Sequence, residues 1–404
     1  MQINLAEFVK SRAEHNELEG ILRSCVHCGF CNATCPTYQV TGDELDGPRG
    51  RIYLLKQVLE GGLVSSITQQ HLDRCLSCRS CETTCPSGVE YGRLLDLGRV
   101  IVDDSVRRSV MDRIQRRLML LVFPYQNRFN QLIQLARLFA PVLPEIIREK
   151  IPEKQIVEQW PTNNYCRKVL ILSGCVQPTL APSIDLAAAK VLDKLSISVV
   201  KVKTDVCCGA LSYHLSEHEK AKALARTNID QCWPYMEQGI EAIIMTASGC
   251  GLALKEYQTL LQYDQDYADK AKKFSKLVKD ISEILQDEDL SVFKPGDVKV
   301  AYQSPCTLQH GQKLSGLVES ILQKVGYSLI QTDNAHLCCG SAGVYSILQP
   351  ELSEQLRENK LKDLHSEQAE YIATANIGCL SHLQAKSSVK VKHWVELLVE
   401  CSEK

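Results

Sequence analysis

The C-terminal half of the chain alternates short apolar runs with longer amphipathic stretches. Residues 169–172, 197–202 and 242–245 are rich in aliphatic and β-branched side chains, a composition that predicts strands. Residues 184–195 and 217–232 carry apolar positions at helical spacing and predict helices between those strands. Because strands that alternate with helices form parallel sheets, we predict a parallel sheet covered by helices.

The pattern of this half occurs twice along the chain. Segment 168–175 corresponds to segment 299–306, and segment 242–250 corresponds to segment 371–379. In both copies a cysteine follows the first strand, a Cys-Cys-Gly triplet begins after 31 intervening residues, and a last cysteine follows a later strand. We therefore predict a duplicated α/β domain.

Each copy contains four cysteines that the predicted fold can bring together, because two of them lie just past the C-terminal ends of strands, where open parallel sheets gather ligands. They are Cys175, Cys207, Cys208 and Cys250 in the first copy, and Cys306, Cys338, Cys339 and Cys379 in the second. Four thiolates suit a zinc ion, a cubane or a modified iron–sulfur cluster. The alternative is small buried apolar residues at tight turns. Recurrence in both copies favours a metal site in at least one.

The N-terminal part carries one cysteine pattern twice, C-x2-C-x2-C-x3-C-P. The first copy is Cys25, Cys28, Cys31 and Cys35, and the second is Cys75, Cys78, Cys81 and Cys85. This is the ligand run of bacterial ferredoxins with two [4Fe–4S] clusters, in which the fourth cysteine of each run binds the other cluster. We therefore assign one cluster to Cys25, Cys28, Cys31 and Cys85, and the other to Cys75, Cys78, Cys81 and Cys35. Structural zinc and disulfides are the alternatives.

The segment between the two cysteine runs has the spacing of a helix at residues 53–59, which predicts an all-helical ferredoxin module. Arg49 and Arg51 lie where this helix opens. They either bind a partner or neutralise cluster charge, or they are ordinary exposed arginines at a helix start.

Residues 104–150 form a basic, leucine-rich stretch with helical spacing. Its cations include Arg113, Arg116 and Arg117. It is either an interfacial helix at a membrane or a connecting helix pair packed between domains, and we favour the helix pair. Four prolines then mark a linker that ends near residue 165: Pro141, Pro144, Pro152 and Pro161.

The fold class is therefore mixed, an all-helical ferredoxin module followed by duplicated α/β domains with parallel sheets. The predicted boundaries are a two-cluster domain at 1–103, a basic helical linker at 104–165, and cysteine-rich α/β domains at 166–290 and 291–404.

Composition narrows the class of function. The chain has 46 Lys and Arg against 48 Asp and Glu, so its charge gives no reason to expect a nucleic-acid partner. Nineteen cysteines in a chain of 404 residues suit metal ligation in a reducing compartment. We see no secretory signal and no apolar run of membrane-spanning length. We expect a cytoplasmic protein with at most a peripheral contact at the inner face of the membrane.

Two groups of residues lie outside these patterns. Cys166, Cys232 and Cys401 have no counterparts and are expected to be structural or exposed thiols. Four histidines lie near the cysteines of the second half, namely His214, His310, His336 and His382, and we assign none of them a ligand role. We find no Ser-His-Asp order, Walker A loop or G-x-G-x-x-G fingerprint.

This combination of motifs resembles a family of iron–sulfur subunits found in glycolate oxidase, lactate-utilisation complexes, anaerobic glycerol-3-phosphate dehydrogenase and heterodisulfide reductase. Segments 42–53, 246–251, 305–310 and 336–343 resemble the glycolate oxidase branch. Heterodisulfide reductase domains end in C-x-x-C and bind a noncubane cluster, whereas here Ala253 and His382 take the place of the last cysteine. The resemblance therefore makes a noncubane cluster and disulfide chemistry less expected.

The resemblance implies the non-flavin electron-transfer subunit of a 2-hydroxy-acid oxidoreductase, with no catalytic residue of its own. Partner flavoprotein subunits, which carry the FAD, would oxidise glycolate to glyoxylate. The two [4Fe–4S] clusters would then relay electrons to an acceptor such as a quinone. Lactate or glycerol-3-phosphate as the donor, a thiol or disulfide reductase in the second half, and a zinc-stapled scaffold are the alternatives.

Overall fold

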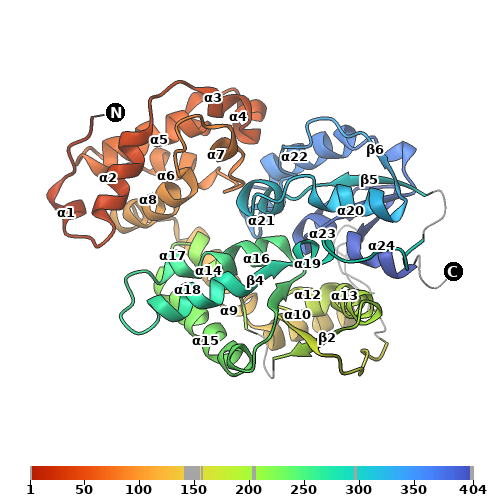
Figure 1. Ribbon diagram of the computed structural model, residues 1–404. Helices are drawn as coiled ribbons and strands as arrows, with labels where there is room; N and C mark the ends of the chain where they lie inside the picture. Colours follow the sequence, from red (N-terminus) through yellow and green to blue (C-terminus); the bar gives the residue numbers. More distant parts are fainter. Residues whose placement is uncertain (1, 141–154, 156–157, 203–205, 295–297, 401–404) are drawn as a thin grey trace.

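The computed structural model describes residues 2–140, 155, 158–202, 206–294 and 298–400. A helical module formed by the N-terminal residues lies beside two α/β domains, and a pair of helices connects the module to them (Figure 1). Pro141, Pro144, Pro152 and Cys401, which the sequence analysis singles out, lie outside the described residues.

Over the described residues 2–105 the N-terminal module has helices and no strands, as predicted. They are α1 Glu7–Lys10, α2 His15–Ser24, α3 Phe30–Ala33, α4 Pro36–Thr41, η1 Glu44–Asp46, α5 Pro48–Leu59, α6 Ser66–Asp73, α7 Ser80–Thr84 and α8 Tyr91–Ser105. Apolar positions at helical spacing, such as Leu18 and Leu22 of α2 and Leu94 and Leu95 of α8, form its buried core. The helix predicted at 53–59 is the C-terminal part of α5, so that prediction is confirmed.

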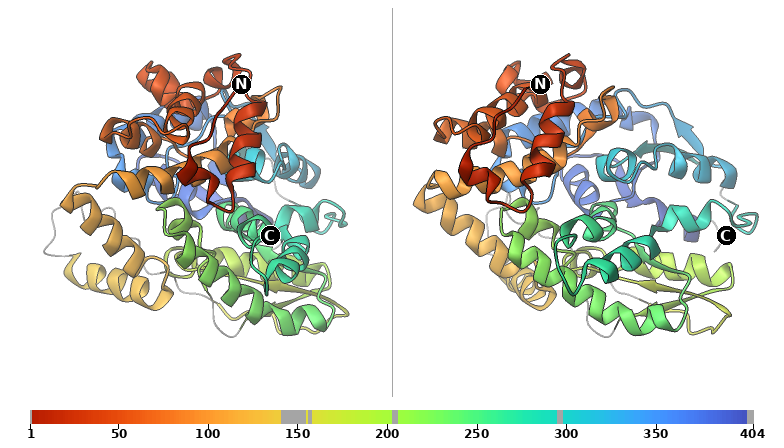
Figure 2. Two further views of the ribbon diagram at one scale, coloured as in Figure 1. Left: turned by 90° about the vertical axis from the view of Figure 1, so that its left-hand side faces the viewer. Right: turned by 60° about the vertical axis from the view of Figure 1, so that its left-hand side comes forward.

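Helices α9 Val110–Val122 and α10 Gln126–Phe139 confirm the predicted helix pair as far as residue 139. The pair lies along the outside of the molecule (Figure 2). Met119 and Leu120 pack against Leu215 of the first α/β domain and Val344 of the second. Arg116 of α9 is mostly buried, and it pairs with Asp112 and Asp73.

The first α/β domain has a four-stranded parallel sheet of order β2-β1-β3-β4. Its strands are β1 Arg167–Ile171, β2 Ile197–Lys201, β3 Ala242–Met245 and β4 Val278–Asp280. Its helices are α12 Gln177–Leu180, α13 Ser183–Lys194, α14 Ala210–His214, α15 His218–Glu237, α16 Ser248–Lys255, α17 Tyr257–Leu260, α18 Ala268–Leu277 and α19 Ile281–Leu285. Each strand and helix predicted for this copy is present, with ends shifted by a few residues.

The second α/β domain repeats the same topology, with sheet order β6-β5-β7-β8 and parallel pairing throughout. Its strands are β5 Lys299–Gln303, β6 Ser328–Ile330, β7 Tyr371–Thr374 and β8 Lys390–His393. Its helices are η3 Thr307–Gly311, α20 Leu317–Val325, α21 Tyr345–Leu348, α22 Pro350–Asp363, η4 Ser366–Gln368, α23 Ile377–Gln384 and α24 Trp394–Glu400. The predicted fold class and duplication are confirmed.

One of the hydrophobic core clusters spans both α/β domains. Ile184 and Val191 of α13 belong to the same buried cluster as Val395 and Leu398 of α24. The His393 Nε2 atom lies 2.9 Å from the Thr246 carbonyl oxygen, which joins the two sheets. Among the described residues no helix is both long and apolar enough to cross a membrane.

Candidate iron–sulfur centres

The two N-terminal cysteine runs form loops of the same backbone conformation. In the first, His27 and Gly29 have φ values of 56° and 86°, and in the second Ser77 and Arg79 have φ values of 52° and 61°. Left-handed residues at these matched positions curl each loop tightly, so that its three cysteines lie together before a short helix begins. The conformation suits a loop that holds several metal ligands at once.

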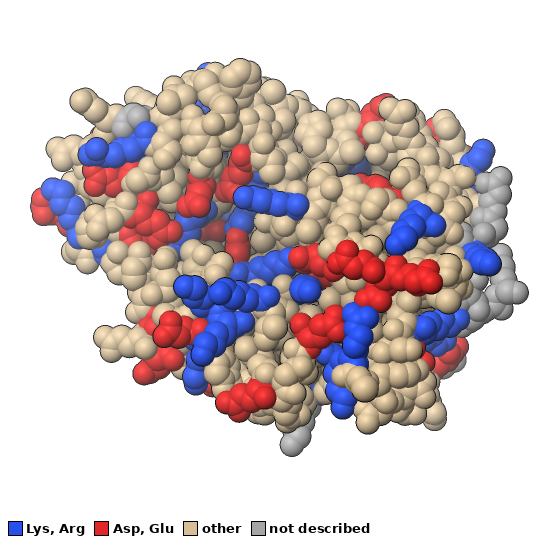
Figure 3. All heavy atoms as spheres, viewed as in Figure 1, with Lys and Arg blue, Asp and Glu red and all other residues tan. Residues whose placement is uncertain are grey.

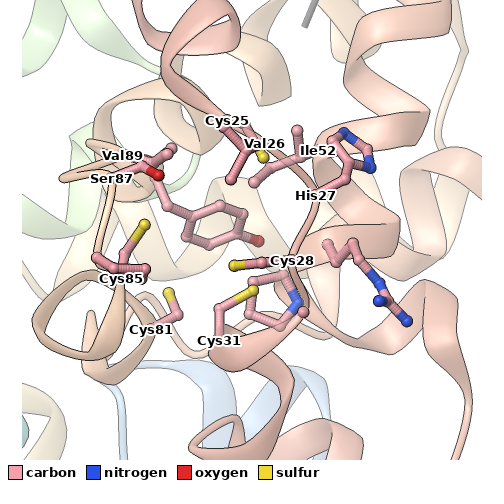
Figure 4. Close-up of a pocket in the computed structure, with 15 residues that line it drawn as sticks. Cys25, Val26, His27, Cys28, Cys31, Ile52, Cys81, Cys85, Ser87 and Val89 are labelled. Carbon is pink, nitrogen blue, oxygen red and sulfur yellow. The ribbon is translucent and has the colours of Figure 1, made fainter.

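The thiols of Cys25, Cys28, Cys31 and Cys85 line one recess of the module, and Cys81 also borders it (Figure 4). Burial raises the pKa of Cys31 to about 11, and the neighbouring Cys25 thiol adds to this effect. Thiols in such a place become ligands when a metal ion displaces their protons. The first predicted set of four is thus together in the structure.

The second predicted set lies deeper. Cys35, Cys78 and Cys81 are buried. Burial raises the pKa of Cys78 and of Cys81, and Cys75 and Cys35 are among the neighbouring thiols that raise both further. The Tyr91 hydroxyl donates a hydrogen bond to Cys75 Sγ at 3.6 Å. These four thiols offer the donor set of a [4Fe–4S] cluster, and Tyr91 supplies a polar contact to one of its sulfurs.

The two sites differ in exposure. Cys28 of the first site is exposed, and its neighbours Val26 and Phe30 are 67% and 63% exposed. In the second site Cys78 packs into an apolar cluster with Cys338 of the second α/β domain. One site therefore faces solvent and the other faces the protein interior.

Arg51 is fully buried rather than exposed, which corrects one of the two interpretations of the arginines at the start of α5. Its guanidinium donates to the His71 carbonyl at 2.7 Å and to Thr37 Oγ1 at 3.2 Å, and lies 3.7 Å from Asp46. Burial lowers the pKa of Arg51, but the neighbouring groups outweigh this effect and raise the pKa above its usual value, and Cys75 contributes most among them. A fixed positive charge therefore lies beside the second site. Arg49 is half-exposed and pairs with Glu44.

The four cysteines of the second α/β domain are also close together. Cys306 Sγ lies 3.8 Å from Cys338 Sγ, and Cys339 forms a buried cluster with Cys379. The Asn376 amide donates to Cys379 Sγ at 3.6 Å. Hydrogen bonding to Cys338 and burial both raise the pKa of Cys306.

The equivalent cysteines of the first α/β domain are arranged in the same way. A hydrogen bond with the Cys207 thiol raises the pKa of Cys175 and lowers that of Cys207. Hydrogen bonds with Cys207 and Cys250, together with burial, raise the pKa of Cys208. Each domain thus brings together the four cysteine thiols that the sequence analysis assigns to its copy of the repeat.

The remaining cysteines and histidines have other surroundings. Cys166 is exposed and Cys232 is buried. His382 does not replace a fifth cysteine ligand, because its Nε2 atom faces Ser353 at 3.3 Å and burial lowers its pKa to about 4. His214 faces Asp96 at 3.2 Å.

The sequence analysis assigns no role to His310, which lies at the boundary between the ferredoxin module and the second α/β domain. Its Nδ1 atom lies 2.8 Å from Thr83 Oγ1 and its Nε2 atom lies 2.8 Å from the His336 carbonyl oxygen. Its place four residues after Cys306 is the one signal that the sequence offers.

Comparison with known proteins gives the class and then the family. The family model described as a 4Fe-4S dicluster domain matches residues 21–89, and the model described as a cysteine-rich domain matches residues 169–255 and 300–384. The molecule is therefore an iron–sulfur protein in which a helical domain with two [4Fe–4S] clusters precedes two cysteine-rich domains, and the prediction of these two clusters is confirmed.

Relatives along the full length identify the family. The glycolate oxidase iron-sulfur subunit of Escherichia coli K12 is 51% identical over 406 residues, which cover 100% of both chains. The probable glycolate oxidase iron-sulfur subunit of Bacillus subtilis 168 is 31% identical and the match covers 95% of each chain. The chain belongs to the family of glycolate oxidase iron–sulfur subunits, which confirms the resemblance.

A solved structure shares the fold. The crystal structure of a hypothetical protein from Helicobacter pylori has a TM-score of 0.56 and 10% sequence identity, with 98% of this chain and 73% of that chain covered. At this identity the likeness concerns the fold alone.

Proposed function

We propose that this chain relays electrons from flavoprotein subunits, which carry FAD and oxidise glycolate to glyoxylate, to a quinone. The observation that carries the proposal is the pair of cysteine sets, one exposed at Cys28 and one buried against the second α/β domain. When bound, [4Fe–4S] clusters accept and release electrons one at a time. The chain's own residues hold these sites side by side and set their surroundings.

The ligand sets follow from which thiols lie together. Cys25, Cys28, Cys31 and Cys85 would hold the first cluster, and Cys75, Cys78, Cys81 and Cys35 the second. Mutual effects on pKa support this grouping, because Cys25, Cys85 and Cys28 all act on Cys31. Cys75 and Cys35 both act on Cys81.

The flavoprotein would dock over the first site. Cys28 is exposed there, and the apolar side chains Val26, Phe30 and Tyr53 around it are also exposed. Figure 3 shows few charged side chains over the neighbouring helices α3 and α4. An apolar rim around an exposed redox site is typical of a surface that a partner covers.

The helix pair α9–α10 would provide a peripheral contact at the cytoplasmic face of a membrane. Exposed apolar side chains lie at helical spacing along both helices, namely Met111, Ile114, Leu118 and Leu121 on α9, and Leu132, Leu135 and Leu138 on α10. Arg113 and Arg117 are exposed beside the α9 residues. Apolar and cationic side chains together suit a surface with anionic lipid headgroups. Flotation with anionic vesicles tests this contact in a variant with Glu at both arginine positions. If the variant floats as the wild type does, this contact is removed from the proposal.

Quinone reduction by the purified complex tests the proposed relay. The complex is isolated through a tag on this chain, and glycolate-dependent reduction of a soluble quinone is compared with reduction of an artificial acceptor that takes electrons from the flavin. In the Cys78→Ser variant we expect reduction of the artificial acceptor to persist while quinone reduction falls at least tenfold. A variant that loses the second cluster and still reduces the quinone at the wild-type rate would contradict the proposal.

A further inference from the structure

Helix α5 begins with two arginines, and each lies beside a different cluster site. Arg49 lines the recess of the first site together with Cys28 and Cys31, and its charge interacts with that of Cys31. Arg51 follows two residues later and interacts in the same way with Cys75 of the second site. The start of one helix thus supplies each site with one positive charge.

The guanidinium of Arg49 lies directly against the first ligand loop. A Cβ atom at Gly29 would lie 2.5 Å from the Arg49 Nη1 atom, so the loop leaves room for the guanidinium only because this residue is glycine. Arg49 also pairs with the Glu44 carboxylate at 2.6 Å, and the two side chains are 39% and 41% exposed. Water and dissolved ions therefore screen the charge of Arg49.

Arg51 is joined to a ligand of the second cluster through one hydroxyl group. Its Nη1 and Nη2 atoms both donate to Thr37 Oγ1 at 3.2 Å, and this oxygen lies 3.3 Å from Cys35 Sγ. The Arg51 side chain is 0% exposed. Because no water surrounds it, its field is weakened less by solvent and salt than that of Arg49.

The carboxylate that faces Arg51 does not cancel its positive charge. Asp46 lies 3.7 Å from Arg51 and 2.9 Å from Arg74, so one carboxylate is shared by two guanidinium groups. The His71 Nδ1 atom also contacts Asp46, at 2.8 Å. Asp46 therefore holds these groups in place, and a net positive charge stays beside the second site.

Two features of the second site oppose its reduction. A reduced cluster carries one more negative charge than an oxidised one, and burial removes the water that would stabilise this charge. Cys78 and Cys81 are buried, whereas Cys28 of the first site is exposed. The Glu82 carboxylate adds repulsion, since it acts on Cys81. Without a compensating positive charge, an electron would therefore stay at the exposed cluster.

We propose that Arg51 raises the reduction potential of the second cluster above that of the first and thereby directs electrons inward. Arg49 acts on the first cluster, and more weakly. In the step concerned, one electron leaves the first cluster, which is oxidised, and reduces the second, and no proton or group is transferred. The inference rests on the proposed relay, in which the flavoprotein is the reductant and the quinone the oxidant.

A redox titration of the anaerobically purified complex with chemical mediators, followed by electron paramagnetic resonance, tests the inference. Cys28→Ser identifies the signal of the first cluster. We expect the second cluster to have the higher potential in the wild type. In Arg51→Met its potential should fall enough to shift the electron at least tenfold toward the first cluster, which is about 59 mV for one electron. Arg51→Lys, which keeps the charge, should cause a smaller decrease.

Three results would overturn the inference: a wild-type second cluster with the lower potential, an unchanged second potential in Arg51→Met, and an equal shift of both clusters in that variant. Asp46→Asn decides the question if Arg51→Met does not assemble its clusters. Loss of this negative charge should raise the potential of the second cluster, and an unchanged or lower potential would contradict the role of Arg51.

Arg49→Gln is the matched control, because Arg49 stands on the same helix two residues away. It should lower the potential of the first cluster and spare the second, and the shift should shrink as the salt concentration is raised. The shift in Arg51→Met should be the same at low and high salt. A salt-sensitive shift in Arg51→Met would show that its charge is screened and would contradict the inference.

The mediators reduce both clusters without glycolate or quinone, so the result does not depend on the proposed donor. The predicted order of potentials in a complex that ignores glycolate would support this inference and contradict the proposed function. Reduction by glycolate in a complex whose second cluster has the lower potential would support the relay and overturn this inference.

Discussion

The Thr83 hydroxyl oxygen lies 2.8 Å from His310 Nδ1, across the boundary between the ferredoxin module and the second α/β domain. His310 Nε2 lies at the same distance from the His336 carbonyl oxygen, which can only accept a hydrogen bond. With the imidazole proton on Nε2, Nδ1 is an acceptor for the Thr83 hydroxyl, whose single proton is shared with the Ser80 carbonyl oxygen 3.0 Å away. This contact joins α7, the helix that contains Cys81, to the π-helix η3 that follows Cys306.

Replacing Thr83 with Val should weaken this boundary, because the buried Nδ1 atom of His310 loses its donor. An unsatisfied buried acceptor costs about 1–3 kcal/mol. Thr84→Val is the matched control, since Thr84 bonds only within its own helix, to the Ser80 carbonyl at 3.1 Å. Denaturant unfolding under anaerobic conditions should show the larger loss for Thr83→Val, and equal losses in the two variants would contradict the role of this contact.

Replacing Tyr91 with Phe should lower the reduction potential of the second cluster. The hydroxyl donates to Cys75 Sγ, and a donor to sulfur stabilises the additional negative charge of the reduced cluster. A net hydrogen-bond energy of about 0.5–1.5 kcal/mol corresponds to a decrease of roughly 20–60 mV for one electron. A redox titration followed by electron paramagnetic resonance measures it. An unchanged potential of the second cluster, or a larger shift in the first, would show that Tyr91 does not tune this site.

The crossed ligand assignment predicts which cluster each fourth cysteine supports. Cys85→Ser should damage the cluster of Cys25, Cys28 and Cys31 and spare the other, although Cys85 follows Cys81 in the sequence. Cys35→Ser should have the opposite effect. Iron content and the two resonance signals report the losses, and preferential loss of the Cys75, Cys78 and Cys81 cluster in Cys85→Ser would refute the crossing.

His393 makes the stability of the paired α/β domains depend on pH. Its Nε2 atom donates to the Thr246 carbonyl and its Nδ1 atom accepts from the Val395 amide at 3.3 Å, so the neutral ring uses both nitrogens. Burial lowers the pKa of His393 to about 4. Because the folded pKa is below that of the unfolded chain, the neutral ring stabilises the fold fully above about pH 6.5, and this contribution is lost as the pH falls toward 4.

The free energy of unfolding should therefore decrease over this range, with a contribution from His393 that approaches about 1.4 kcal/mol per pH unit. Denaturant unfolding at several pH values measures the slope. We expect the slope to be smaller in His393→Gln and unchanged in His365→Gln, where the half-exposed ring faces Asp333 at the surface. A wild-type slope in His393→Gln would contradict this account.

The features that the sequence predicts are those that recur at fixed spacing. The eight N-terminal cysteines form two copies of one ligand pattern. The Cys-Cys-Gly triplets that begin at Cys207 and Cys338 reveal the duplication before any strand is assigned. Hydrophobic periodicity is sufficient for the helices and parallel strands, because each buried face recurs with the period of its element.

The features that the sequence does not predict depend on contacts between distant segments. Arg51 stands at a helix start, where arginines are often exposed, and the packing of α5 against η1 and α6 buries it beside Asp46 and His71. The contact of Thr83 with His310 joins residues 227 positions apart, and no periodic pattern encodes such a pair. The π-helix η3 that follows Cys306 and packs on α7 is likewise not predicted, since Cys175 and Cys306 stand equally far from their Cys-Cys-Gly triplets.

Electron paramagnetic resonance of the anaerobically purified complex, recorded before and after addition of glycolate, tests the relay most directly. The account predicts that reduced [4Fe–4S] signals appear on the timescale of catalytic turnover. Clusters that dithionite reduces but that stay oxidised in the presence of glycolate would contradict it and point to lactate or glycerol-3-phosphate as the donor.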